Sequence, residues 1–106
     1  MSEFEYKIID DETGKYALVN LSESVLGGFQ AMEFSQALDS ISEDNINRII
    51  IDMSRVNIIN SSGIGMIAGA FRELKAKDCE LLLTNVPEPV IKLLVMTRLD
   101  KVIKIV

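Results

Sequence analysis

Polar and apolar residues alternate at the start of the chain, which is the pattern of a half-exposed β-strand. The apolar side chains of Phe4, Tyr6 and Ile8 are separated by charged ones. A polar stretch at residues 10–15 (DDETGK) then precedes a second apolar run at residues 16–21 (YALVNL). This pattern predicts two antiparallel strands joined by a turn, at the edge of a sheet.

Residues 29–41 change to the period of a helix. Phe34, Ala37, Leu38 and Ile41 fall on one helical face, and the polar residues lie largely elsewhere. An amphipathic helix is therefore predicted. Loops are predicted on both sides of it, at residues 22–28 and 42–47.

The next apolar segment, residues 48–53, contains three consecutive isoleucines and shows no alternation. Such a run is typical of a strand that is covered on both faces, which predicts a central place in the sheet. Apolar residues then recur at steps of three and four from Ile64 to Leu74, so a second helix is expected to run to about Lys77.

The last third of the chain repeats this alternation of strand and helix. Residues 80–84 (ELLLT) predict another short strand. Pro87 and Pro89 mark a turn and the first helical position of a third helix, which should continue through Met96. Residues 102–106 are expected to close the chain as a strand.

The predicted order is β-β-α-β-α-β-α-β, and its last five elements form two successive βαβ units. Right-handed crossovers make the strands of such units parallel, whereas the opening hairpin is antiparallel. We therefore expect a small α/β fold, with a mixed sheet and helices packed on it, as a single domain spanning residues 1–106.

Composition narrows the classes of function. The chain has 106 residues, 48% of them hydrophobic, which suits one domain. Cys79 is the only cysteine and there is no histidine. A single cysteine excludes an intramolecular disulfide. The absence of histidine excludes histidine-based catalytic triads and most transition-metal sites within one chain. We expect no metal, no other cofactor and no enzymatic activity.

The net charge of −5, with 16 acidic and 11 basic residues, argues against nucleic-acid binding through phosphate contacts. No apolar run approaches the roughly 18–20 residues that span a bilayer, and the first residues are acidic where a signal peptide would be basic. We expect a soluble, cytoplasmic protein without membrane insertion, as a monomer or a weak dimer.

Candidate chemistry gathers at the start of the second helix. Asn60, Ser61 and Ser62 precede a helix, where side-chain oxygens commonly cap orphan amides. Gly63 and Gly65 follow, with a third glycine at position 69, and each disfavours a helix by about 0.8–1 kcal/mol relative to alanine. Either tight packing against the sheet or clearance for another molecule could explain them. A helix N-terminus would also tolerate a phosphoryl group on Ser62.

Two other possible motifs give little support for a catalytic or nucleotide-binding function. Gly63, Gly65 and Ala68 formally satisfy G-x-G-x-x-A, but nine residues separate them from the preceding strand, whereas the dinucleotide motif follows its strand directly. A serine nucleophile at position 61 or 62 would lack both a histidine base and a lysine in an S-x-x-K arrangement.

Asp52 ends a strand at a place where ligands gather in open α/β sheets. A carboxylate that caps the loop, bonded to nearby amides or to Ser54, is the favoured interpretation. The acidic residues at positions 10–12 and 43–44 lack the spacing of a calcium loop and are interpreted as solvated turns.

The stretch at residues 48–71, RIIIDMSRVNIINSSGIGMIAGAF, resembles the signature of the STAS domain family, the bacterial anti-sigma-factor antagonists. The resemblance covers the strand, Asp52, Ser54, the apolar pair at 58–59 and the run from Ser61 to Gly65. The order of predicted elements and the ending VIKLLVMTRLDKVIKIV are also similar. Asn60 stands where the family usually has aspartate.

The resemblance implies a switch. In that family the hydroxyl residue just before the glycine is phosphorylated by a serine kinase that is itself an anti-sigma factor; here that residue is Ser62, with Ser61 as the second candidate. The unphosphorylated protein binds the kinase and frees a sigma factor. Phosphorylation breaks the complex, and a metal-dependent serine phosphatase restores it. The implied partner-binding residues are Asp52, Ser54, Asn60, Ser61, Ser62, Gly63, Ile64 and Gly65.

Two classes of function remain open. The first is this phosphorylation-switched antagonist. The second is a STAS domain that does not switch and serves as a scaffold or subunit, for example in a lipid-transport or stress-signalling assembly. The second predicts an association that Ser62→Glu leaves unchanged.

Overall fold

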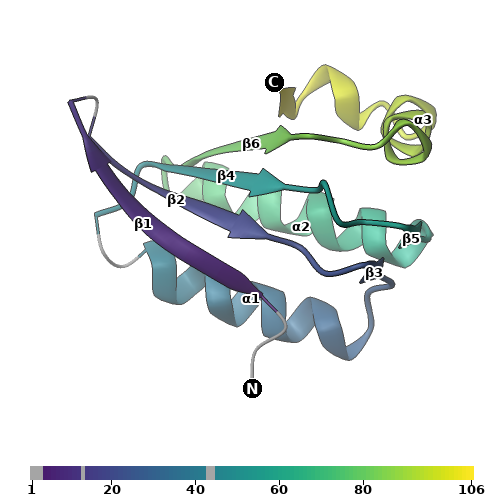
Figure 1. The fold of residues 1–106 in the computed structure, drawn as a ribbon, viewed down its shortest axis with the longest axis horizontal. Helices are drawn as coiled ribbons and strands as arrows, with labels where there is room; N and C mark the ends of the chain where they lie inside the picture. Colours follow the sequence, from purple (N-terminus) through teal and green to yellow (C-terminus); the bar gives the residue numbers. More distant parts are fainter. Residues whose placement is uncertain (1–3, 13, 43–44) are drawn as a thin grey trace.

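The main sheet of the protein has five strands in the order β1-β2-β4-β6-β7 (Figure 1). The structure is a computed structural model that describes residues 4–12, 14–42 and 45–106. The strands are β1 (Glu5–Asp11), β2 (Gly14–Asn20), β4 (Arg48–Asp52), β6 (Glu80–Thr84) and β7 (Lys104–Ile105). The helices are α1 (Phe29–Ser42), α2 (Ser61–Ala76) and α3 (Glu88–Met96), followed by a 3-10 turn, η1 (Leu99–Lys101).

Strand pairing confirms the mixed sheet. β1 pairs antiparallel with β2, whereas β2, β4, β6 and β7 are parallel to one another. The predicted hairpin at the edge and the two βαβ units are therefore present. The strands of the hairpin are longer than expected, because β1 reaches Asp11 and β2 begins at Gly14. In the predicted turn at residues 10–15, Thr13 lies outside the described residues. In the predicted loop at residues 42–47, Glu43 and Asp44 lie outside them.

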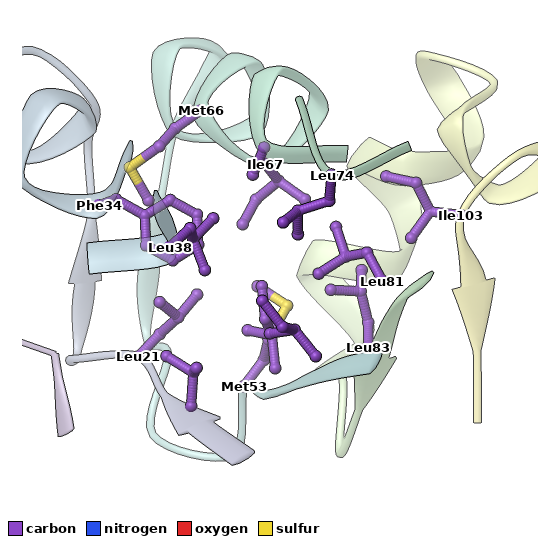
Figure 2. Close-up of a cluster of buried hydrophobic side chains, with 14 of the residues drawn as sticks. Leu21, Phe34, Leu38, Met53, Met66, Ile67, Leu74, Leu81, Leu83 and Ile103 are labelled. Atoms are coloured by element: carbon purple, nitrogen blue, oxygen red, sulfur yellow. The ribbon is translucent and has the colours of Figure 1, made fainter. Parts of the chain in front are cut away.

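The core lies on one face of the sheet. In Figure 1, α1 and α2 lie on the same side of the strands. Figure 2 shows Phe34 and Leu38 of α1 and Ile67 of α2 pointing toward Leu21 and Leu83 of the sheet layer. All five of these side chains are buried. Because this face excludes water over the length of both helices, it supplies most of the apolar burial that stabilises the domain.

The opposite face explains one wrong prediction. The central position of β4 in the sheet is confirmed, but β4 is not covered on both faces. Ile49 and Ile51 are buried in the core, whereas Ile50 points away from it and is only half-buried. Ile50 lies between Leu18 of β2 and Leu82 of β6 in the register. The run of isoleucines therefore reflects apolar neighbours within the sheet rather than a second layer of helices.

A second, two-stranded parallel sheet was not predicted. It joins β3 (Ser24–Val25), which lies within the expected loop at 22–28, to β5 (Ile58–Ile59). Strands of two residues are too short to show a period, so the sequence pattern could not indicate them. This small sheet fixes the loop before α1 beside the loop before α2.

The end of the chain differs in detail from the prediction. Glu88 is the first residue of α3 and Pro87 its N-cap, so Pro89 occupies the second helical position. The last strand is limited to Lys104–Ile105, because residues 102–103 form the turn that follows η1. No helix in the described ranges is both long and apolar enough to cross a membrane.

Candidate functional site

The N-terminus of α2 is capped by Asn60, one of the three predicted capping residues. Asn60 has an extended backbone, and its side-chain Oδ1 accepts a hydrogen bond of 2.8 Å from the amide of Gly63. Its backbone carbonyl accepts from Ile64 at 3.0 Å. Ser61 and Ser62 are the first two helical residues, and both are exposed. The cap thus uses Asn60 and leaves the two serine hydroxyls on the surface.

Gly63 is required by packing. A Cβ at this position would overlap the backbone carbonyl of Val25 in β3. Gly27 in the loop before α1 is restricted in the same way, because its φ is +77° and a Cβ would come within 2.7 Å of the Ser62 Cβ. The close approach of these backbones holds Ser62 against the loop. The packing interpretation of the glycines is therefore correct for Gly63.

Gly65 and Gly69 have a different environment. A Cβ at either position would meet no atom within 4 Å. Both glycines line a groove of about 400 Å³ between α1 and α2, together with Ser62 at one end. On the α1 side the groove includes Ser35, whose hydroxyl donates to the Glu73 carboxylate at 3.1 Å. The absence of side chains at these glycines therefore opens space beside Ser62.

Exposed apolar side chains occur on the loop before α1, on α1 and on β5. We call Leu26, Phe29, Met32 and Ile58 the apolar rim; their exposed fractions are 46%, 73%, 57% and 56%. Leu26 adjoins Gly27, which touches Ser62, and Ile58 pairs with Ser24 in the small sheet. Contiguous groups of exposed apolar side chains are typical of protein-binding surfaces. The sequence analysis did not identify the rim, although Phe29 and Met32 are apolar residues off the buried stripe of α1.

The two hollows next to Ser62 contain no basic side chain of the described residues. The groove between the helices is lined by Glu73 and by no lysine or arginine of the described residues. A neighbouring hollow of about 530 Å³, formed by the loop before α1, includes Glu23 and Gly27 and likewise no basic residue among those described. A phosphoryl group on Ser62 would therefore be stabilised by the helix N-terminus and by water, because no guanidinium or ammonium group lines these two hollows.

Asp52 and Ser54 form a separate group. Asp52 Oδ1 accepts from the amide of Ser54 at 2.8 Å, and Oδ2 accepts from Asn85 Nδ2 at 3.2 Å. The predicted role of Asp52 as a loop-capping carboxylate is thus confirmed. Partial burial alone would raise the pKa of Asp52, but the hydrogen bonds from Ser54 and Asn85, with the nearby charge of Arg55, outweigh it and lower the pKa below its ordinary value of 3.8.

The remaining predicted residues differ in accessibility. Gly63 and Ile64 are buried, whereas Asn60, Ser61, Ser62 and Gly65 are exposed. The exposed residues can contact another protein directly, and the buried pair sets the position of the turn. Among the described residues, no group of three or more cysteine, aspartate or glutamate side chains could hold a metal ion. The site can therefore present a surface and accept a modification on a hydroxyl.

Removing the cap should destabilise the helix. We expect Asn60→Ala to lower the free energy of unfolding by about 1 kcal/mol, because the Gly63 amide loses its acceptor. Asn60→Asp keeps an acceptor and adds a favourable charge at the helix N-terminus, so its stability should equal or exceed that of the wild type. Urea denaturation of the three proteins measures the effect, and equal stability of Asn60→Ala and wild type would contradict it.

The lowered pKa of Asp52 predicts a pH dependence. Because its folded-state pKa is depressed, ionised Asp52 stabilises the fold above its unfolded-state pKa, and this contribution disappears as the pH falls through the folded-state pKa. The difference in free energy of unfolding between wild type and Asp52→Asn should be constant near neutral pH and shrink between about pH 5 and pH 2. Denaturation at several pH values tests this, with Asp10→Asn, at an exposed position of β1, as the control.

The fold and the capped, serine-bearing start of α2 define a class of protein. The chain belongs to the STAS domain family, whose model matches residues 29–106. The resemblance found in the sequence is thereby confirmed. The arrangement of strands and helices also agrees with the fold of solved anti-sigma factor antagonists.

Similar proteins are described as anti-sigma factor antagonists. An anti-sigma-B factor antagonist of Listeria monocytogenes is 33% identical over 55 residues, which cover 52% of this chain and 48% of that protein. The match thus spans about half the length of that relative. A crystal structure from Thermotoga maritima, described as a candidate anti-sigma factor antagonist, has a TM-score of 0.75 and 28% identity, covering 96% of this chain and 84% of that one.

The fold is also that of SpoIIAA, an anti-sigma factor antagonist. Its unphosphorylated form has a TM-score of 0.68 and 18% identity, covering 97% of this chain and 86% of that one. The phosphorylated Bacillus form has a TM-score of 0.71 and 19% identity, covering 97% of this chain and 90% of that one.

Proposed function

We propose that this protein is an anti-sigma-factor antagonist whose binding is controlled by phosphorylation of Ser62. Its unphosphorylated form binds an anti-sigma factor that is also a serine kinase, and a sigma factor is released. The observation that carries the proposal is the exposed Ser62 hydroxyl at the capped N-terminus of α2, directly before the tightly packed Gly63. Membership of the STAS family and the similarity to a protein solved in phosphorylated form support it.

The surroundings of the two serines favour Ser62 over Ser61. Ser62 lines the groove between α1 and α2, and its backbone touches Gly27. A kinase that binds both the groove and the loop before α1 would therefore hold the Ser62 hydroxyl at a defined position. Ser61, one residue earlier, does not line the groove.

The apolar rim gives the proposed switch a physical basis. When a partner covers Leu26, the neighbour of the Gly27 that touches Ser62, the region around Ser62 loses water. Phosphorylation adds about 1.5–2 negative charges at neutral pH, and burial of that charge without a cation is strongly unfavourable. Since no lysine or arginine of the described residues lines the two hollows, the partner has to supply any compensating charge. A partner without one dissociates.

The same arrangement suits reversal of the switch. A phosphoryl group on the exposed side chain of Ser62 would remain accessible in the free protein, so a metal-dependent serine phosphatase could remove it. In this proposal the chain is the substrate of both enzymes, has no enzymatic activity of its own and acts in the cytoplasm as one domain spanning residues 1–106.

The test is phosphorylation in vitro. The cognate anti-sigma-factor kinase and Mg-ATP are incubated separately with the wild type, Ser62→Ala and Ser61→Ala. The intact mass of each protein is then measured. We expect a gain of one phosphoryl group on wild type and Ser61→Ala and none on Ser62→Ala. Undiminished phosphorylation of Ser62→Ala would exclude this site.

A further inference from the structure

Two adjacent glycines join the loop before α1 to that helix. Gly27 and Gly28 have φ angles of +77° and +62°, in the left-handed region that favours glycine. Both lie between β3 and the start of α1 (Figure 1). Because glycine has the widest choice of backbone conformations, two glycines in a row form a hinge unless other contacts hold the segments on either side of them.

Backbone contacts hold the chain before these glycines only in part. The carbonyl of Glu23 accepts hydrogen bonds from the amides of Asn57 and Ile58, at 2.8 and 3.0 Å. The pairing of β3 with β5 ends at Val25. Leu26, which carries one of the exposed side chains of the apolar rim, therefore lies between the small sheet and the glycines.

The side chain of Gln30 spans the two glycines. Its Oε1 accepts a hydrogen bond of 3.0 Å from the amide of Leu26, and its Nε2 donates one of 2.8 Å to the carbonyl of Ser24. One backbone donor and one backbone acceptor thus match the two ends of the carboxamide. Gln30 is itself the second residue of α1. Its side chain therefore ties the end of β3 to the helix across the hinge.

The conformation of this loop determines the surface next to Ser62. Gly27 lies so close that a Cβ on the glycine would come within 2.7 Å of the Ser62 Cβ. Rotation about the glycines would move Leu26 relative to the serine. Ser62 itself would stay in place, because the start of α2 is held by the Asn60 cap and by the packing of Gly63.

We propose that Gln30 is a positioning residue, which holds the loop before α1 in the conformation that the partner of Ser62 binds. This role rests on the proposed function. When only a fraction of a protein is in its binding-competent conformation, its apparent affinity falls by that fraction. Release of the hinge should therefore weaken partner binding, although neither Ser62 nor any side chain of the apolar rim is changed.

The test compares Gln30→Met with Gln36→Met in phosphorylation by the cognate anti-sigma-factor kinase and Mg-ATP. Methionine replaces the carboxamide by a thioether, which is only a weak acceptor. Gln36 is an exposed residue of the same helix and provides the matched control. We expect Gln30→Met to raise the KM for phosphorylation about tenfold, as a loop that is competent about a tenth of the time would do. Its kcat should stay near that of the wild type, because Ser62 keeps its position on α2.

Hydrogen exchange of the free protein tests the contact itself. The amide of Leu26 donates to Gln30 and its side chain is exposed, so this bond protects the amide from exchange. We expect the Leu26 amide to exchange at least about tenfold faster in Gln30→Met than in the wild type. Gln36→Met should match the wild type in exchange at Leu26, in KM and in kcat.

Several results would overturn the proposal. An unchanged exchange rate at Leu26 in Gln30→Met would mean that the loop does not depend on Gln30. Faster exchange with an unchanged KM would mean that the partner does not depend on the loop, and an equal rise in KM for Gln36→Met would indicate a general effect on α1. A wild type that the kinase leaves unmodified would exclude the proposed function, and the role of Gln30 with it.

Discussion

Replacing Gly63 by alanine is expected to lower the free energy of unfolding by about 1–3 kcal/mol or more, although alanine favours helices. The added Cβ would overlap the carbonyl of Val25, which belongs to the backbone of β3 and cannot rotate away. Relief requires β3 or the start of α2 to move. Urea denaturation of the variant measures the loss of stability.

Gly65→Ala is the matched control. Gly65 lies two residues further along the same helix, and a Cβ there meets no atom within 4 Å. Alanine should therefore raise the free energy of unfolding by about 0.5–1 kcal/mol. If the groove serves kinase access, the same variant should be phosphorylated more slowly despite its greater stability. A destabilised Gly65→Ala, or a Gly63→Ala as stable as the wild type, would contradict the assignment of these glycines.

The second large effect concerns the partner. We expect Ser62→Glu to weaken the complex with the anti-sigma factor at least about 30-fold, since a buried, unpaired charge at an interface disfavours binding by about 2–5 kcal/mol. The charge would lie at one end of the groove, beside the Gly27 loop that carries Leu26, and no lysine or arginine of the described residues lines that groove. Isothermal titration calorimetry with the purified anti-sigma factor measures the affinity.

Two variants make this measurement specific. Ser62→Ala should retain nearly the affinity of the wild type, because it removes the hydroxyl without adding charge. Phe29→Ala should weaken binding and leave folding unchanged, because the Phe29 side chain is 73% exposed. If Ser62→Glu binds as tightly as the wild type, the protein is a STAS scaffold or subunit that does not switch.

The order of the main elements could be predicted from local patterns. The period of two in β1 and the period of α1 each require only residues that are close in sequence, and the cap at Asn60 depends on an amide three residues away. Asp52 was likewise predicted correctly as a loop cap, because its bond to Ser54 is local. Its second bond, to Asn85, joins two strands and could not be foreseen.

Residues 48–71 carry enough information, as a sequence, to indicate the family and to single out Ser62 as the candidate for modification. Contacts between distant segments decided the rest. Helices α1 and α2 lie on one face of the sheet, and Ile50 on the other face is half-buried. The small sheet of β3 and β5 brings Gly27 against Ser62. These contacts distinguish Gly63, fixed by the backbone of Val25, from Gly65, which faces open space. A sequence pattern reports the surroundings of a residue along its own helix or strand, whereas the role of a glycine depends on which backbone folds against it.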